Sequence, residues 1–200
     1  MDLDQLIIDI SKRGKKGLHF ILASIIIWSA VLVVWLLPIE DILTKNLLIF
    51  CFTAPLPLLA YMISKIIKSE FSSKGNPLNK LGLLFAFNQF LYILIAMWVY
   101  PTVPDKMVMV LAIIFGAHLL PFGWLYNSKA YSVMSILISF TAIIIGIMFN
   151  AVVLSIVMIV FEIIFSIWLI FENKFLNLKS EKQIWILTWQ TIKKIVKCTY

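Results

Sequence analysis

The sequence predicts an all-α fold: a polytopic membrane helix bundle with six transmembrane helices and amphipathic flanking helices at the N- and C-termini. Three observations lead to this prediction. The chain is 62% hydrophobic and only 14% charged, whereas about a quarter of the residues in a soluble domain are charged. Apolar runs long enough to cross a bilayer recur six times. Basic residues are concentrated in alternate gaps between those runs.

The apolar runs give the expected number of spans. A helix rises ~1.5 Å per residue, so ~20 apolar residues cross the ~30 Å hydrocarbon core. The fifth and sixth runs are almost continuous, and only Asn150, with Gly146 nearby, indicates a turn between them. The runs are residues 17–37, 47–67, 81–100, 107–126, 131–149 and 151–171.

Lysine and arginine in the short flanking segments predict the orientation, because cytoplasmic flanks are enriched in them. Of the 17 basic residues, all but Lys45 and Lys106 lie in the N-terminal flank, the second and fourth gaps, and the C-terminal tail. This asymmetry predicts an even number of spans and places both termini in the cytoplasm. The chain divides into one six-span domain over residues 1–171 and a basic amphipathic tail over 172–200.

Both flanks have apolar residues at helical spacing. In the N-terminal flank, Leu3, Leu6, Ile7 and Ile10 follow the i, i+3, i+4, i+7 pattern of an amphipathic helix. We expect the bilayer as partner, with anionic headgroups at the cytoplasmic face and the tail helix lying among them. A protein partner or a homo-oligomer is the alternative, and no motif indicates nucleic acid. The apolar face of the tail consists of Trp185, Trp189, Ile192 and Val196.

Four polar residues at matching depth form a candidate buried site. An ionisable residue at mid-membrane costs about 2.5–3.5 kcal/mol on insertion scales, so each one is a functional candidate. Glu162 in the sixth run and His118 in the fourth lie near the bilayer centre, as do Asn88 and Gln89 in the third. Facing a common interior, they would form one hydrogen-bonded cluster. Two interpretations stay open: a proton relay in which Glu162 and His118 share one proton, and a structural clasp between helices.

Prolines within two of the runs mark candidate kinks. Pro55 and Pro57 lie in the second run, and Pro121 lies in the fourth, close to Gly116 and His118. A proline inside a helix removes one backbone hydrogen bond and bends the helix. Membrane helices tolerate this where the freed backbone is satisfied by neighbours or lines a cavity. These residues therefore predict either a kink beside a cavity or a kink that serves packing alone.

Three segments carry a resemblance to a known family. They read GLHFILASIIIW at residues 17–28, NPLNKLGLLFAFNQ at 76–89 and GAHLLPFGWLYNSKAY at 116–131. With them the chain resembles a family of uncharacterised multi-pass membrane proteins from low-GC Gram-positive bacteria, which is defined only as a domain of unknown function. The resemblance covers most of the chain and is weaker in the tail. It implies a bacterial cell-membrane protein, and it implies no activity and no catalytic residue.

The sequence lacks the motifs of known intramembrane enzymes. There is no H-E-x-x-H zinc site and no phosphate-binding loop. Because His19 and His118 are the only histidines, a multi-histidine metal centre is excluded. We expect no metal and no cofactor, and an unusual lipid-modifying enzyme is the weakest hypothesis. Two hypotheses are stronger: a small-solute or proton-coupled transporter, and a non-enzymatic membrane component that binds a lipid, a peptide or a protein partner.

Overall fold

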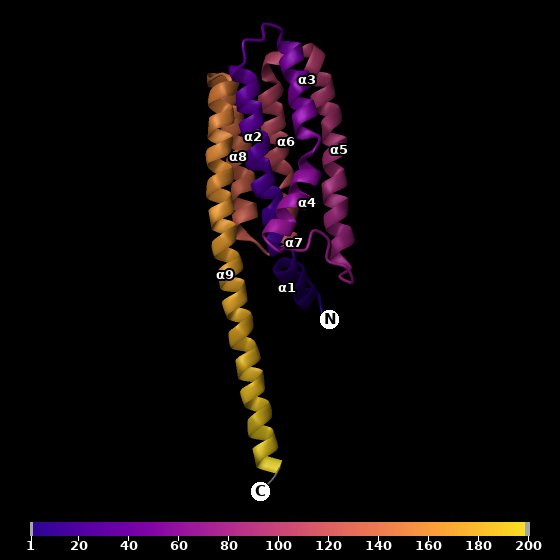
Figure 1. The fold of residues 1–200 in the computed structure, drawn as a ribbon, viewed down its shortest axis with the longest axis vertical. Helices are drawn as coiled ribbons and strands as arrows, with labels where there is room; N and C mark the ends of the chain where they lie inside the picture. Colours follow the sequence, from indigo (N-terminus) through magenta and orange to yellow (C-terminus); the bar gives the residue numbers. More distant parts are fainter. Residues whose placement is uncertain (1, 199–200) are drawn as a thin grey trace.

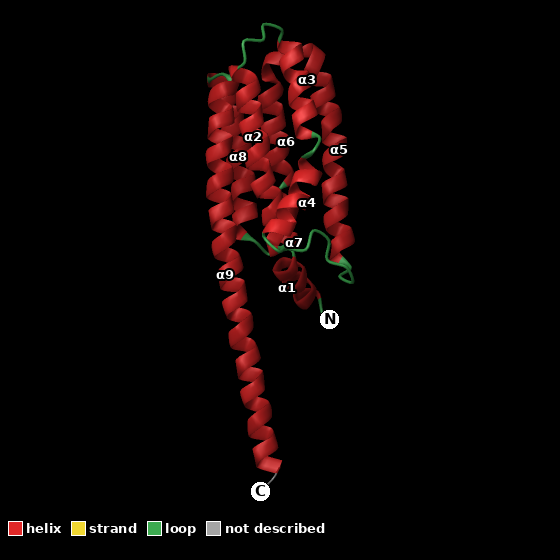
Figure 2. Ribbon diagram, viewed as in Figure 1, coloured by secondary structure: helices red, strands yellow, loops and turns green. Residues whose placement is uncertain are grey.

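A computed structural model describes the backbone of residues 2–198 and the side chains of residues 2–178. These described residues form helices and loops without a β-strand (Figure 1; Figure 2). Six helical segments are long and apolar enough to cross a membrane, which confirms the predicted fold class. They are Lys15–Leu36, Ile42–Ile66, Leu78–Thr102, Pro104–Leu125, Lys129–Met148 and Ala151–Leu178.

The six segments run alternately up and down, so both termini lie at the same end of the bundle (Figure 1). We call this the α1 end, because helix α1 lies there, and we call the other the opposite end. In chain order the elements are α1 (Leu3–Arg13), the 3-10 turn η1 (Lys15–Gly17), α2 (Leu18–Leu36), α3 (Ile42–Thr53), α4 (Leu56–Ile66), α5 (Leu78–Thr102), the 3-10 turn η2 (Pro104–Lys106), α6 (Met107–His118), α7 (Leu120–Leu125), α8 (Lys129–Met148) and α9 (Ala151–Cys198).

Polar caps define where the helices begin. The Asp41 carboxylate accepts hydrogen bonds from the backbone N–H groups of the first turn of α3, so the second span begins five residues before the predicted run. Asn150 likewise accepts a hydrogen bond from the backbone N–H of Val153, at 3.1 Å. Phe149 is extended, and α9 starts at Ala151. The predicted break between the fifth and sixth spans is therefore confirmed.

The two predicted runs that contain internal prolines, the second and the fourth, each consist of two helices. Between α3 and α4, Pro55 is the N-cap of α4, and Pro57 lies in its first turn. Between α6 and α7, the chain turns at Leu119, and Pro121 lies in the first turn of α7. Proline lacks a backbone N–H, so it fits the first turn of a helix, where that group has no intrahelical partner. The interruptions thus lie at the prolines that marked candidate kinks.

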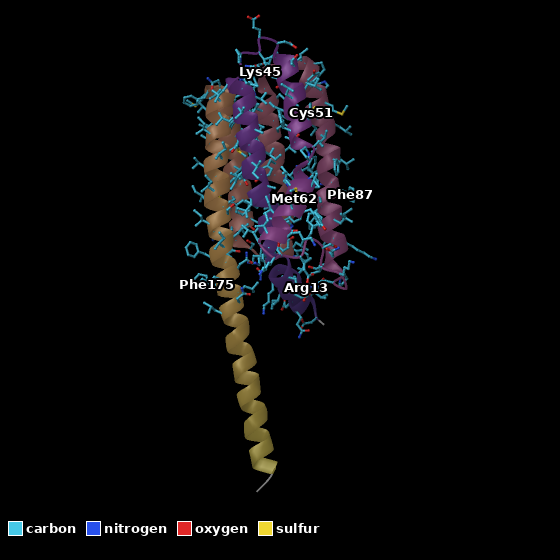
Figure 3. The ribbon with its side chains drawn as sticks, viewed as in Figure 1. Arg13, Lys45, Cys51, Met62, Phe87 and Phe175 are labelled. Carbon is cyan, nitrogen blue, oxygen red and sulfur yellow. The ribbon has the colours of Figure 1, made fainter. Side chains whose placement is uncertain are left out.

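The bundle has a buried side around α2 and a loosely packed side around α5. Helix α2 packs against α9, α4 and α3, whereas α5 packs mainly against α6 and α7. In Figure 1, α5 and α9 lie at opposite edges of the bundle. Phe87 on α5 and Phe175 on α9 are 57% and 69% exposed and point outward (Figure 3). Large exposed apolar side chains all around the bundle suit contact with lipid.

Three glycines bring α6 and α7 close to α8. A Cβ atom added to any of them would lie nearer to a facing side chain than real Cβ atoms approach. The contact positions recur every seven residues on both sides, which sets the antiparallel register of these helices. Small residues allow such close approach between membrane helices. The facing pairs are Met109 with Gly146, Gly116 with Ser139, and Gly123 with Ser132.

Helix α1 packs against the bundle itself. Its apolar face, which includes Ile10, packs against Leu78 of α5 and Leu125 of α7. Asn76 in the loop after α4 donates hydrogen bonds to the Leu6 carbonyl and to the Asp9 carboxylate. The apolar face predicted in the N-terminal flank therefore exists, and it contacts protein.

The C-terminal tail does not form a separate helix. Helix α9 continues without interruption for 48 residues and leaves the bundle roughly along its long axis (Figure 1; Figure 2). At ~1.5 Å per residue, its last twenty residues extend it by ~30 Å. A tail helix among the headgroups, as the sequence predicted, would run along the membrane surface. The straight continuation of α9 differs from that arrangement. Its predicted apolar face, from Trp185 to Val196, lies outside the described side chains.

Candidate functional site

The candidate site centres on Glu162, a buried acid at the interface of α9 with α2. Its side chain is 0% exposed. The Oγ atom of Ser24 on α2 lies 2.5 Å from one carboxyl oxygen, Oε2. Among the described residues, no basic side chain pairs with Glu162, and none donates to its other oxygen, Oε1. Buried polar atoms are usually satisfied, because leaving one unpaired costs about 1–3 kcal/mol.

Hydrogen-bond accounting at Ser24 indicates which form of Glu162 fits this geometry. Ser24 Oγ lies 2.7 Å from the Ile21 carbonyl oxygen as well as 2.5 Å from Glu162 Oε2. A hydroxyl group has one proton to donate and two lone pairs to accept with. Both contacts are full hydrogen bonds when the carboxyl group carries a proton and donates it to Ser24, while Ser24 donates to Ile21. The arrangement therefore fits a neutral carboxylic acid.

A second acid of α9 is held very differently. Glu172 lies ten residues further along the helix, about 15 Å toward the α1 end. Its carboxylate accepts hydrogen bonds from Lys16 Nζ at 2.7 Å, Ser128 Oγ at 2.7 Å and the Ala130 backbone N–H at 2.9 Å. The ion pair is mostly buried, with 7% and 16% of the two side chains exposed. Glu172 thus joins α9 to the start of α8 and to η1, with its charge fully compensated.

The backbone before α2 fixes the position of this ion pair. Lys15, Lys16 and Gly17 all have positive φ angles, of 47°, 50° and 68°. The Tyr131 hydroxyl donates to the Lys16 carbonyl oxygen at 2.9 Å, and the Asn173 amide donates to that of Lys15 at 3.0 Å. A Cβ atom at position 17 would lie 2.9 Å from the Tyr131 hydroxyl oxygen. This turn anchors the start of α2, from which Ser24 projects one and a half to two turns later.

His118 lies at the junction of α6 and α7 and bonds within its own segment. Its Nδ1 atom is 2.6 Å from the Phe115 carbonyl oxygen. Its ring makes edge contacts with Phe115 and Phe122, at centroid distances of 5.4 and 6.1 Å. No hydrogen bond to Glu162 is found for it within the described part of the chain. The nearby Gly116 serves the close contact of α6 with α8.

Asn88 and Gln89 lie on α5, at the edge of the bundle away from α9 (Figure 1). Asn88 is exposed and donates to the Tyr92 hydroxyl oxygen one turn later, at 2.9 Å. Gln89 is half-buried. The structure thus does not bring the four predicted residues into one cluster. Matching depth gives the height of a residue in the bilayer, and it does not say which helices are neighbours.

The sequence places Ser24 among the candidate partners of Glu162, although it does not single Ser24 out. Ser24 lies seven residues into the first run, close to the depth at which Glu162 lies in the sixth. A search for small hydroxyl side chains at that depth would have included it. The Lys16–Glu172 pair has a weaker signal, namely opposite charges at the same-side ends of the first and sixth runs.

The described residues contain no group of three or more His, Cys, Asp or Glu side chains placed to hold a metal ion.

Comparison with known proteins gives a family and no activity. The model of a family of unknown function, DUF7010, matches residues 3–172. No curated protein and no solved structure matches the chain. The match covers the bundle and ends at Glu172, so the projecting part of α9 lies outside it. The low-GC Gram-positive origin stays a prediction.

Proposed function

The chain belongs to the family of unknown function DUF7010, and from the geometry of Glu162 we propose a function that the family description does not supply. We infer a six-span integral protein of the bacterial cell membrane, with both termini in the cytoplasm and its basic residues facing anionic headgroups. In this proposal the protein carries a small solute across the membrane in a proton-coupled reaction. Glu162 binds the coupling proton.

The observation that carries the proposal is the incomplete hydrogen bonding of a fully buried acid. Glu172, ten residues away, has three donors, one of which is the ammonium group of its counter-ion Lys16. Among the described residues, Glu162 has one hydroxyl partner, and its Oε1 atom has no hydrogen-bond partner. A residue that only holds helices together stabilises the fold most when each of its polar atoms has a hydrogen-bond partner, as at Glu172. A group that exchanges a proton needs a stable neutral state and an incomplete set of partners, as at Glu162.

Loss of the proton links Glu162 to the contact between α2 and α9. A buried carboxylate without a counter-ion is costly. The Glu162 carboxylate would accept a hydrogen bond from the Ser24 hydroxyl group. The Ile21 carbonyl would then lose Ser24 as its donor. Deprotonation therefore favours a state in which water reaches Glu162, and protonation favours the closed state seen here. Such a pair of states is what a proton-coupled carrier needs.

Proton flux through reconstituted protein tests the proposal. Proteoliposomes with an internal pH dye and a potassium-valinomycin clamp receive a pH gradient in the presence of a mixture of small solutes, because a coupled carrier moves protons only together with its solute. The wild-type protein should dissipate the gradient faster than protein-free liposomes, and Glu162→Gln should reduce the rate to that of protein-free liposomes. Ser166→Ala is the matched control, because it removes from the same helix a buried hydroxyl group that has no hydrogen-bond partner among the described residues. Equal rates for the wild type and Glu162→Gln would contradict the proposal.

A second candidate is a non-enzymatic membrane component that binds a protein partner. It is favoured by α9, which continues for twenty residues beyond the membrane-length segment. A helix projecting from the bundle gives a cytoplasmic partner an extended surface. Flux no faster than in protein-free liposomes, for the wild type as for Glu162→Gln, would favour this candidate over the carrier.

A further inference from the structure

The turn after α4 contains a lysine in a conformation that favours glycine. Four described residues other than glycine have φ angles in the left-handed region: Lys15, Lys16, Lys68 and Asn127. Lys68 ends α4 in a Schellman motif, since the Ser69 N–H donates to the Ser64 carbonyl and the Lys68 N–H to the Lys65 carbonyl. Glycine is the usual residue at this position, because a Cβ atom is disfavoured there.

Two of the three left-handed lysines have partners within the protein. Lys15 Nζ donates to the Ile67 carbonyl oxygen at 2.5 Å, and Lys16 Nζ pairs with Glu172. The Lys68 side chain is exposed, and the described residues offer its ammonium group neither a hydrogen bond nor an ion pair. Glu70, the nearest acid along the chain, already pairs with Arg13 at 2.7 Å. Lys68 thus combines an unfavourable backbone conformation with a positive charge that none of the described protein groups pairs with.

A second lysine and two aromatic rings lie beside Lys68. Lys65 is exposed, and its Nζ atom is 5.0 Å from the centroid of the Tyr61 ring. Tyr61 makes an edge contact with Phe71 in the following loop, at 5.6 Å between centroids. Aromatic rings and lysines are enriched where a membrane helix meets the headgroups. The end of α4 thus presents two positive charges and an aromatic pair at that level.

An apolar strip continues from this site along the outer face of α4. Leu58, Tyr61, Met62 and Lys65 follow i, i+3, i+4, i+7 spacing, so they share one face of the helix. Leu58 and Met62 are 61% and 55% exposed. A ligand that matches the whole surface has an anionic group at the lysines and an apolar chain along the strip. A phospholipid has both parts, whereas a free phosphate ion has only the first.

We propose that the end of α4 is a binding site for one anionic phospholipid, whose phosphate accepts hydrogen bonds from Lys65 and Lys68 and whose acyl chain lies along Leu58 and Met62. The site is independent of Glu162, so the proton-flux experiment does not bear on it. The basic flanks predict a general attraction to anionic headgroups, and this site gives that attraction one specific location, the end of α4.

Lipid titration of the purified full-length protein in a neutral detergent tests this site. Native mass spectrometry measures the affinity for phosphatidylglycerol and for phosphatidylcholine. The wild type should prefer phosphatidylglycerol, and Lys65→Gln and Lys68→Gln should each weaken its binding about five-fold. Lys129→Gln is the matched control, because Lys129 is exposed at the same end of the bundle and outside the proposed site. Its effect should be smaller than two-fold.

Lys68→Gly separates lipid binding from folding. Glycine adopts the left-handed conformation without strain, so this variant should unfold at the same temperature as the wild type or higher, and it should still lose phosphatidylglycerol affinity. Unchanged affinity in Lys68→Gly would overturn the proposal, as would an equal loss in Lys129→Gln. Competition by glycerol phosphate as strong as by phosphatidylglycerol would also overturn it, because the acyl chain would then contribute nothing.

Discussion

Glu162 and Glu172 lie on the same helix, and their surroundings give them different properties. Three donors, including the ammonium group of Lys16, hold Glu172 as a charged link between helices. Within the described part of the chain, Glu162 has Ser24 as its one hydrogen-bond partner. The single proton of that hydroxyl group cannot be donated to both Glu162 and the Ile21 carbonyl. A proton on Glu162 resolves this conflict. The same residue type thus links helices at one position and, in the proposed function, binds the coupling proton at the other.

Infrared spectroscopy can test the protonated state of Glu162 directly. The wild type at neutral pH should show the carbonyl stretch of a protonated carboxyl group, and Glu162→Gln should remove this band. Ser24→Ala should shift the band to higher frequency, because the carboxyl group loses its hydrogen-bond partner, and should destabilise the fold by about 1–3 kcal/mol. Ser166→Ala should leave the band in place. A spectrum without a protonated carboxyl band that depends on Glu162 would show that the acid is charged.

The sequence could predict the importance of Glu162 and could not predict its partner. An isolated acid within a 20-residue apolar run needs an explanation wherever its helix lies. Its partner depends on helix packing, which places α2 beside α9 and leaves α5 at the far edge. Asn88 therefore bonds within its own helix, although it lies at a similar predicted depth. Polarity and depth are properties of the sequence, whereas adjacency belongs to the fold.

For pairs of helices, too, the sequence predicts local properties, whereas the contacts between helices depend on the fold. The prolines of the second and fourth runs correctly indicated interruptions, because the missing N–H is a local property. The contact of α6 and α7 with α8 depends on glycines that face particular side chains every seven residues. The sequence indicated Gly116 as part of a kink. In the structure, Ser139 of the neighbouring helix lies where a side chain at position 116 would begin. That role requires knowledge of which helix lies opposite.

Substitution of glycine by alanine tests the register of this contact. At Gly116, a Cβ atom would lie 2.6 Å from Ser139 Oγ and 2.9 Å from the Ser139 backbone N. Since backbone cannot rotate away, Gly116→Ala should destabilise the fold by about 1–3 kcal/mol. Gly82→Ala is the control, because its Cβ atom would meet only the end of the Leu125 side chain, at 3.0 Å. It should be neutral or stabilising by up to about 1 kcal/mol.

Unfolding by sodium dodecyl sulphate in mixed micelles, followed by circular dichroism, measures both variants. The expected result is a lower midpoint for Gly116→Ala than for the wild type, and an equal or higher midpoint for Gly82→Ala. Equal shifts for the two variants would mean that α6 and α8 are not in close contact at Gly116. The result is informative for helix packing whatever the solute or partner of the protein is.

For the whole molecule, run length and charge together predict the six-helix architecture. Run length alone leaves the fifth and sixth spans joined, and the charge asymmetry requires a turn between them, which Asn150 caps. The continuation of α9 beyond the bundle could not be predicted in the same way. An amphipathic segment next to a span fits two arrangements, a helix on the membrane surface and a straight extension. The absence of a break between the two segments decides between them.

Cysteine labelling tests the orientation of the whole molecule. In a background with Cys51→Ser and Cys198→Ser, single cysteines replace exposed residues at the two ends of the bundle: Lys74→Cys at the α1 end and Asp105→Cys at the opposite end. The basic flanks predict that the α1 end faces the cytoplasm. A membrane-impermeant maleimide should therefore label Asp105→Cys in intact cells and Lys74→Cys only after permeabilisation. The reverse pattern would invert the orientation, and labelling of both in intact cells would contradict a bundle that separates its two ends across the membrane.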